Sequence, residues 1–323
     1  MFPSPALTTF PSTTPRRVVL LGGSGLLGGA FRRAWSDRED FSLIEYPRAE
    51  LNLTRPEQIE SILARTDFDL LINAAAYTQV DDAEVQPALA NVVNATAAGI
   101  IADHCAARRA RLVHFSTDYV FDGTSPRPYT ETDPAHPISA YGRSKLAGEH
   151  RVAAASPHHL IIRLAWLFGP GRDAFPEWVL SQALRHPEVR VVSDKTGSPT
   201  YSEDVPAWIQ ALLATPAAGI IHLVNGPACT WLDYAQGVLA TAHAAAWPLL
   251  THRPTPVSLA SLPGLTAPRP VQSALSTARF TALTHLTPRP WHEAMAQHLL
   301  SKSVPPSSKT TFVSTLPPVP QAP

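Results

Sequence analysis

The chain has few cysteines and no arrangement of residues that suggests a metal site. Only Cys105 and Cys229 occur among 323 residues, and their contexts suggest neither a disulfide framework nor a metal clip. The histidines are scattered without the spacing of metal ligands, so no metal is predicted. Unpaired thiols suit a reducing compartment, and we therefore expect a cytoplasmic protein.

The chain also lacks an excess of either charge and any long apolar run. Lysine plus arginine and aspartate plus glutamate each number 26. This balance leaves no net field to attract nucleic acid or acidic lipid. No apolar run is long enough to span a bilayer. We therefore predict that neither nucleic acid nor a membrane is a partner.

Both ends of the chain are dense in proline, serine and threonine. Such segments bury too little apolar area to offset the entropy of ordering, so residues 1–15 are predicted to be a disordered leader and residues 301–323 a disordered tail. Arg16-Arg17 before an apolar run could indicate a twin-arginine export signal. We favour a first strand that enters a glycine turn, because removal of this segment would destroy the motif that follows.

That motif is Gly22-Gly23-Ser24-Gly25-Leu26-Leu27-Gly28. It lies between an apolar run at 18–21 and a pattern with helical spacing. Missing side chains let the backbone approach a pyrophosphate, and a helix N-terminus supplies N–H groups and a positive dipole end. Tight turns use glycine too, but the position between a strand and a helix favours a dinucleotide site.

The ends of the next two predicted strands offer further cofactor contacts. Arg48 follows a strand at 41–46 and would accept the 2′-phosphate of NADPH, whereas an acid there would favour NAD. Glu45 nearby keeps NADH open, and a solvated loop cation is the alternative interpretation of Arg48. A third apolar strand at 68–73 leads into small residues at 74–76, which would let a ligand lie against the backbone or a helix pack closely.

Chemistry concentrates between residues 112 and 145. The apolar run at 112–115 predicts a buried strand, and Thr117 and Asp118 follow near its carboxyl end, where ligands bind in open α/β sheets. In the predicted helix beyond, Tyr141 and Lys145 are four residues apart and share one face. A lysine cation would lower the pKa of a phenol from about 10. Such a phenol could protonate a carbonyl oxygen as hydride reaches the carbon. Taken alone, Tyr-x-x-x-Lys also fits an ordinary amphipathic helix.

Several segments together carry a resemblance to a known family. They are Asn73-Ala74-Ala75-Ala76-Tyr77-Thr78-x-Val80-Asp81-x-Ala83-Glu84, Ser116-Thr117-Asp118-Tyr119-Val120-Phe121-Asp122-Gly123, Tyr141-Gly142-x-x-Lys145-x-x-Gly148-Glu149, Arg163-Leu164-Ala165-Trp166-Leu167-Phe168-Gly169, Gly197-Ser198-Pro199-Thr200 and Arg269-Pro270-x-x-Ser273-x-Leu275. Over roughly residues 17–300 the chain resembles the dTDP-4-dehydrorhamnose reductases, a family of extended short-chain dehydrogenases/reductases.

The residue patterns and the resemblance predict an α/β fold, with a Rossmann-type doubly wound parallel sheet and a smaller, interleaved C-terminal substrate lobe. We expect the dinucleotide-binding Rossmann domain at 16–168, with a returning strand near 219–226. The substrate-binding lobe is expected at 169–218 and 227–300. A homodimer is a candidate assembly.

The resemblance implies a role for each matching residue. Tyr141 would donate the proton, Lys145 would tune it and hold the nicotinamide ribose, and Thr117 would polarise the sugar carbonyl. Asp118 and Trp166 would bind the substrate, and Arg269 could bind a nucleotide diphosphate because a guanidinium matches phosphate oxygens. The candidate cofactor-binding residues are Gly22, Gly25, Leu26, Leu27, Gly28, Arg48, Asn52, Leu53, Ala75, Ala76, Tyr77, Thr78, Tyr141 and Lys145.

The sequence departs from the family pattern at three positions. Asn52 replaces the usual Asp, Ala165 replaces a Ser or Thr before the pocket tryptophan, and Lys195 stands where Gln is common. The first departure suggests weaker contacts with adenine. The other two leave the details of the substrate open.

The function that the resemblance implies is NAD(P)H-dependent reduction of the C4 keto group of dTDP-4-dehydro-beta-L-rhamnose to dTDP-beta-L-rhamnose, in dTDP-rhamnose biosynthesis. NADPH is the expected cofactor, and NADH stays open. One alternative is a reductase or epimerase of another nucleotide sugar. A second is a non-catalytic, cofactor-binding regulatory subunit, which the intact Thr117, Tyr141 and Lys145 disfavour.

Overall fold

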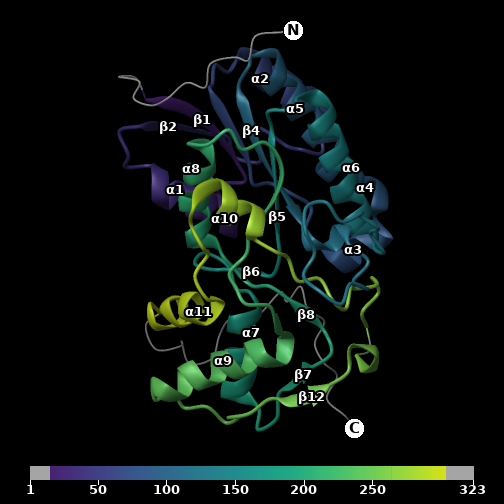
Figure 1. Ribbon diagram of the computed structural model, residues 1–323, viewed down its shortest axis with the longest axis vertical. Coiled ribbons are helices and arrows are strands. Elements are labelled where there is room, and N and C mark those ends of the chain that lie inside the picture. Colours follow the sequence, from purple (N-terminus) through teal and green to yellow (C-terminus); the bar gives the residue numbers. More distant parts are fainter. Residues whose placement is uncertain (1–14, 263, 303–323) are drawn as a thin grey trace.

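A computed structural model describes residues 15–262 and 264–302 (Figure 1). The predicted disordered leader and tail lie outside the described residues, apart from Pro15, Ser301 and Lys302. Ser301 donates a hydrogen bond to the His298 carbonyl, and the Lys302 ammonium donates to Glu177. The first two residues assigned to the tail are thus bonded to the folded part of the chain.

A six-stranded sheet forms the centre of the molecule, and every strand is parallel to its neighbours. In sheet order the strands are β10 (Gly219–His222), β5 (Leu160–Leu164), β4 (Arg111–Thr117), β3 (Leu70–Asn73), β1 (Arg16–Leu21) and β2 (Phe41–Glu45). The prediction of a Rossmann-type parallel sheet is confirmed. The direction of winding reverses between β1 and β3, and in open α/β sheets ligands bind at such a switch point.

Helices cover both faces of this sheet, because alternate residues of each buried strand point to opposite sides. One face packs against α1 (Leu26–Trp35), α8 (Val205–Leu213) and α10 (Ala278–Thr284). The other face packs against α2 (Pro56–Arg65), α5 (Ala97–Ala107) and α6 (Ala140–Ala155). In β1, for example, Val18 and Leu20 join the first core, and Val19 and Leu21 join the second.

Short elements join these strands and helices near the switch point. They are α3 (Val80–Val85), α4 (Pro87–Asn91), a π-helical turn η1 (Val92–Thr96) and a 3-10 turn η2 (Asp118–Val120). The π-helical turn interrupts the run from α4 to α5. Such bulges frequently occur at functional sites.

A second lobe lies below the sheet in Figure 1 and has its own apolar core. Its helices are α7 (Phe175–Arg185), α9 (Trp231–Ala244) and α11 (Trp291–Leu300). Three two-stranded pairs accompany them: β7 (Arg190–Val192) with β12 (Thr255–Val257), β8 (Thr196–Gly197) with β11 (Cys229–Thr230), and β6 (Leu167–Phe168) with β9 (Thr200–Tyr201). The 3-10 turns η3 (Ser202–Asp204) and η4 (Leu259–Ser261) complete the described elements.

The chain crosses between the lobe and the sheet more often than the predicted boundaries allow. The predicted lobe includes α8 and α10, but both helices pack on the sheet with β10 (Figure 1). Trp208 of α8 and Phe280 of α10 lie in one core with the strands, their rings 6.1 Å apart. Among the described residues, no helix is both long and apolar enough to cross a membrane.

Candidate active site

The glycine turn after β1 is packed against the segment that follows β3. Gly22 has a φ of +81°, and a Cβ added there would lie 2.7 Å from the Ala75 backbone nitrogen. A Cβ on Gly28 would lie 2.1 Å from the Gly22 carbonyl oxygen. Gly25 starts α1 without a side-chain cap, so backbone N–H groups are presented where the helix begins. This geometry is compatible with the predicted pyrophosphate contact of Gly22, Gly25 and Gly28, which stays a prediction.

The other residues predicted to bind the cofactor occupy two kinds of position. Some lie in loops, and others are buried in the apolar cores beside the sheet. Leu27 and Leu53 are buried in the two cores of the sheet, and Leu26 is half-buried at the helix start. The Asn52 side chain accepts hydrogen bonds from the Thr54 backbone and hydroxyl. Asn52 thus stabilises its own loop.

Of the polar side chains at the end of β2, that of Glu45 lies nearest the glycine turn, and that of Arg48 does not reach it. A Cβ on Gly23 would lie 2.0 Å from a Glu45 carboxylate oxygen and 2.7 Å from the Arg32 guanidinium. Glu45 and Arg32 form a bidentate ion pair, with the closest atoms 2.8 Å apart. Arg48 is exposed in the following turn. Arg32 was not among the predicted residues, although an arginine one helical turn past the glycine motif is a signal that the sequence contains.

Asn94 holds the cofactor segment after β3 and was not predicted. Its side chain accepts a hydrogen bond from the Tyr77 nitrogen at 2.9 Å and donates to the Tyr77 oxygen at 3.0 Å. It also donates to the Ser144 hydroxyl of α6 at 2.9 Å. Asn94 is buried in the π-helical turn. The only signal that could have identified it is an asparagine inside an apolar helical segment. The predicted cofactor residue Thr78, next to Tyr77, is exposed.

The structure brings the three predicted catalytic residues together at the carboxyl end of β4. Ser139 caps α6 by accepting a hydrogen bond from the Gly142 nitrogen at 3.1 Å. This cap starts the helix that carries Tyr141 and Lys145. Thr117 lies close enough to the Tyr141 hydroxyl to lower the pKa of the phenol, and the Lys145 ammonium donates to the Phe115 carbonyl at 2.6 Å.

Burial dominates the electrostatics of this centre. It raises the pKa of Tyr141 to about 12, although the proximity of Thr117 acts in the opposite direction. Burial also lowers the pKa of Lys145 to about 8, against the attraction of Glu149. The predicted lowering of the Tyr141 pKa by Lys145 is therefore not observed. The reason is that the phenol is desolvated and the ammonium is directed at a backbone carbonyl.

Asp118 is buried beside the catalytic centre. One carboxylate oxygen accepts a hydrogen bond from the Thr117 hydroxyl at 3.1 Å, and the other accepts one from the Ser273 hydroxyl at 2.6 Å. Burial raises the pKa of Asp118, and the positive charge of Lys195 opposes that rise. Asp118 therefore connects the catalytic strand to a segment that lies 155 residues further along the chain.

Trp166 lies where the sheet passes into the lobe. Its φ of 42° is in the left-handed region, which strains a bulky residue and is often associated with functional sites. A Cβ on Gly197 would lie 2.4 Å from the indole ring. The indole nitrogen is buried without a hydrogen-bond partner within residues 15–262 and 264–302.

Arg269 differs from its predicted role. Its guanidinium forms a bidentate pair with Asp81, with the closest atoms 2.6 Å apart, and also donates to the Ala267 carbonyl. The Arg269 side chain is only 3% exposed. The planar fork with which arginine binds a diphosphate is thus paired with a carboxylate. In this structure, Arg269 joins the segment before Ser273 to the start of α3.

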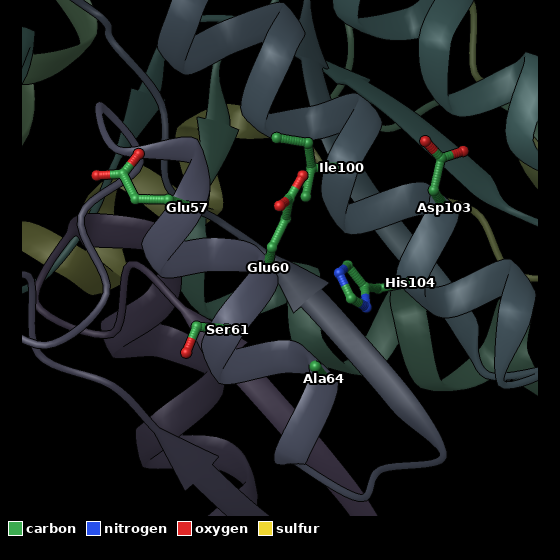
Figure 2. Close-up of a pocket in the computed structure, with 7 residues that line it drawn as sticks. All are labelled: Glu57, Glu60, Ser61, Ala64, Ile100, Asp103 and His104. Carbon is green, nitrogen blue, oxygen red and sulfur yellow. The ribbon is translucent and has the colours of Figure 1, made fainter.

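A hollow of about 530 Å³ lies elsewhere, between α2 and α5 (Figure 2). Mainly polar side chains from the two helices line it: Glu57, Glu60, Ser61, Ala64, Ile100, Asp103 and His104. None of the predicted site residues belongs to this set. In the described part of the chain, no three or more His, Cys, Asp or Glu side chains are grouped so that they could hold a metal ion. The candidate active site is therefore the polar centre at the end of β4.

Comparison with known proteins shows the family to which the chain is similar over most of its length. Residues 16–303 match the family described as the RmlD substrate binding domain. A dTDP-4-dehydrorhamnose reductase of Mycobacterium tuberculosis is 39% identical over 312 residues, which cover 93% of this chain and 97% of the relative. A probable dTDP-4,6-dihydroxy-2-methyloxan-3-one 4-ketoreductase of Streptomyces antibioticus is 36% identical, covering 87% of this chain and 94% of the relative.

Solved structures show the same similarity. The crystal structure of a dTDP-4-dehydrorhamnose reductase from Bacillus anthracis in complex with NADP superimposes with a TM-score of 0.82. That protein is 30% identical, and the match covers 89% of this chain and all of that one.

Proposed function

Since the chain belongs to the dTDP-4-dehydrorhamnose reductase family, we propose that it reduces the C4 keto group of dTDP-4-dehydro-beta-L-rhamnose to dTDP-beta-L-rhamnose with NADPH. The observation that carries this proposal is the meeting of Thr117, Tyr141 and Lys145 at the carboxyl end of β4. The solved relative in complex with NADP supports the choice of cofactor. The intact catalytic group also argues against a purely regulatory subunit.

In the proposed reaction, different residues bind the cofactor and donate the proton. The turn from Gly22 to Gly28 would hold the pyrophosphate, and Lys145 would hold the nicotinamide ribose. Bound NADPH supplies the hydride that reduces the sugar carbon. Tyr141 gives its proton to the C4 oxygen. Because burial raises the pKa of Tyr141 to about 12, the phenol carries that proton throughout the neutral range.

Burial and orientation at the centre serve this proton transfer. The Thr117 hydroxyl donates to Asp118, which holds Thr117 in place close to the Tyr141 hydroxyl. Orientation of a proton donor within hydrogen-bond reach contributes about 10²–10⁴-fold to rate. By the family resemblance, Trp166 would lie against the sugar.

An assay of NADPH oxidation with a panel of 4-keto nucleotide sugars tests the proposal. We expect the highest kcat/KM with dTDP-4-dehydro-beta-L-rhamnose and the rhamnosyl nucleotide as product. Turnover of every other sugar in the panel, but not of this one, would reject the assignment. Tyr141→Phe is the matched control, because it retains the ring and removes the proton.

A second candidate function is reduction of a different dTDP-linked 4-keto sugar. The similarity to the probable 4-ketoreductase of Streptomyces antibioticus favours it, as do Ala165 and Lys195, where the family pattern differs. The two functions share one mechanism and differ only in the sugar. The ranking of kcat/KM across the same panel distinguishes them.

We also infer a homodimer in the cytoplasm. Cys105 and Cys229 are both buried and free, which suits a reducing compartment. Analytical ultracentrifugation would give the mass of the assembly, and cell fractionation would locate it.

A further inference from the structure

We propose that Asp81 is a positioning residue for the sugar substrate: it fastens residues 266–275, here called the strap, so that Ser273 of the strap holds the Asp118 carboxylate in place. Asp81 lies in the first turn of α3, and the strap brings Ser273 to the carboxyl end of β4. The effect on the sugar rests on the proposed function, because Asp118 is predicted to bind the substrate.

The Asp81 carboxylate accepts four hydrogen bonds from the strap. One oxygen accepts from the backbone nitrogens of Thr266 and Ala267, at 3.0 and 2.9 Å, and from the Arg269 guanidinium at 3.0 Å. The other oxygen accepts from Arg269 at 2.6 Å. Arg269 also donates to the Ala267 carbonyl at 2.8 Å, within the strap itself. Because the guanidinium is buried, its charge depends on this carboxylate.

Beyond this anchor, backbone hydrogen bonds join the strap to β8 and to the backbone that follows η2. The Thr196 nitrogen donates to the Val271 carbonyl at 2.7 Å, and the Ser273 nitrogen donates to the Thr196 carbonyl at 2.9 Å. The Gln272 nitrogen donates to the Gly123 carbonyl at 3.1 Å. Gly123 has a φ of +83°, and a Cβ there would lie 2.6 Å from the Val271 nitrogen. The strap therefore passes in direct contact with this backbone.

The strap reaches the catalytic centre through Ser273. The Ser273 hydroxyl donates to one oxygen of the Asp118 carboxylate at 2.6 Å, and both side chains are buried. The other oxygen of that carboxylate accepts from the Thr117 hydroxyl at 3.1 Å. These two hydroxyls, one from the strap and one from β4, together set the orientation of the carboxylate. Asp118 keeps this orientation only while the strap is in place.

Loss of the Asp81 charge would release the strap rather than a single bond. A buried guanidinium without a counter-charge costs more free energy than a backbone hydrogen bond contributes. Arg269 would therefore turn toward water and draw the strap away from α3. Ser273 follows Arg269 closely in the strap, so its hydroxyl would no longer be held against Asp118. The expected result is weaker binding of the sugar.

The cofactor segment before α3 is held independently of the strap. Both hydrogen bonds of the Tyr77 backbone to a side chain are made with Asn94, at 2.9 and 3.0 Å. Asn94 in turn donates to the Ser144 hydroxyl of α6. A change at Asp81 leaves these bonds in place, so the affinity for NADPH should be retained.

Amide hydrogen exchange, followed by two-dimensional NMR, tests the fastening without substrate. In Asp81→Asn, the N–H groups of Gln272 and Ser273 should exchange about tenfold faster or more, because the loss of charge-assisted bonds makes opening of the strap easier. The substitution touches neither of these two amides, so faster exchange there means that the strap opens as a unit. Unchanged exchange at Gln272 and Ser273 would show that Asp81 holds only a local turn, and would overturn the proposal.

Two further variants accompany this measurement. Asp82→Asn is the matched control, because Asp82 is the next residue of the same turn, is exposed, and loses the same charge. It should leave the exchange of the strap unchanged, and an effect equal to that of Asp81→Asn would overturn the proposal. Arg269→Gln breaks the pair from the other side and leaves no buried guanidinium, so it replaces Asp81→Asn if that variant does not fold. It should speed exchange at Gln272 and Ser273 in the same way.

Steady-state kinetics measure the consequence for the sugar. Asp81→Asn should raise the KM for dTDP-4-dehydro-beta-L-rhamnose about tenfold, the effect of losing one hydrogen bond to a charged group, with kcat and the KM for NADPH little changed. Ser273→Ala removes the bond to Asp118 directly and should raise the KM by a similar factor.

The combination of Asp81→Asn and Ser273→Ala decides whether the two residues act through one bond. We expect no further rise in KM when both are present, because either substitution alone already removes the contact with Asp118. Effects that multiply would show that Asp81 acts by another route and would overturn the proposal. The exchange measurement needs no substrate, so a wild-type protein that reduces no 4-keto sugar would reject the proposed function without affecting that test.

Discussion

At the scale of single residues, burial is the strongest influence on the catalytic centre. Tyr141, Lys145 and Asp118 are each at most 9% exposed, and burial disfavours the charged form of all three. Spacing alone had suggested that Lys145 lowers the pKa of Tyr141. Burial is not visible in a spacing, and it reverses that expectation in this structure. Tyr141 therefore keeps its proton at neutral pH and is not ionised to a phenolate.

The first prediction concerns Tyr141. Tyr141→Phe removes the proton but retains the ring, which packs edge-on against Tyr119 at 5.7 Å. We expect turnover to fall by about 10²–10⁴-fold, with the affinity for NADPH and the melting temperature little changed. Single-turnover kinetics and fluorescence titration measure the two quantities. Turnover within a few-fold of wild type would show that another group donates the proton.

The second prediction concerns the buried Lys145. Its pKa is lowered from 10.5 to about 8 in the folded protein, so the unfolded chain binds more protons between these values. Stability therefore rises with pH across this window, because the buried ammonium loses its charge. We expect Lys145→Met to reduce this rise. Urea unfolding at about pH 7 and about pH 10 gives the slope, and an equal slope in both proteins would contradict the lowered pKa.

The third prediction concerns cofactor choice. Arg32 lies over Gly23 in its pair with Glu45, whereas Arg48 is exposed. If a 2′-phosphate recruits Arg32, Arg32→Ala should weaken NADPH about tenfold, the effect of roughly 1.4 kcal/mol, and leave NADH nearly unchanged. Arg48→Ala should show the same selectivity if the sequence-based prediction holds. Titration of both cofactors decides, and equal effects on NADPH and NADH remove that arginine from the phosphate site.

The sequence predicted those site residues that depend on local order. Thr117 ends a strand and Tyr141 follows a helix cap, so both positions could be inferred from their neighbours. The partners of Asp118 and Arg269 could not, because Ser273 and Asp81 are 155 and 188 residues away in the chain. Such partners depend on how the chain folds back, and a spacing of residues contains no information about that.

At the scale of elements, the junction of β1 and α1 is constrained by backbone contact. Gly28 and Gly29 are adjacent in the same helix, but only Gly28 is in tight contact with the turn. A Cβ on Gly28 would lie 2.1 Å from the Gly22 carbonyl oxygen, whereas one on Gly29 would lie 3.2 Å from the flexible end of Arg33 and 3.7 Å from the Gly23 carbonyl oxygen, an ordinary contact distance. The pair therefore provides a test with its own control.

We expect Gly28→Ala to abolish NADPH binding or to lower the melting temperature markedly, because a backbone carbonyl cannot yield. Gly29→Ala should be neutral or stabilising by up to about 1 kcal/mol, since alanine favours a helix. Thermal unfolding with and without cofactor compares them. Similar behaviour of the two variants would show that the glycine turn can shift to accommodate a Cβ at position 28.

Element type was easier to predict than element packing. The inner strands β1, β3 and β4 contain buried apolar runs, and these runs were predicted to be strands. The amphipathic pattern of α8 showed that one face is apolar but not which surface covers it. Both the sheet and the lobe offer an apolar surface, and α8 packs on the sheet.

At the scale of the whole molecule, the sheet and the lobe are joined by several crossings of the chain. Residues 1–14 and 303–323 contribute no predicted site residue, and their composition does not support a core. We predict that a chain shortened to residues 16–302 keeps its melting temperature and its activity. The comparison requires equal cofactor concentrations, because a bound ligand raises stability. Loss of activity would show that one of the removed ends takes part in the site or in assembly.

The position of β10 at the edge of the sheet has a consequence for synthesis of the protein on the ribosome. The first five strands of the sheet are complete at Leu164, but β10 begins only at Gly219. At about 5–20 residues per second, several seconds separate the two. Until then β5, whose five residues are all buried in the finished protein, presents an open edge that can pair with another chain. Nascent chains paused before Gly219 should therefore be the form most prone to aggregate and most dependent on chaperones.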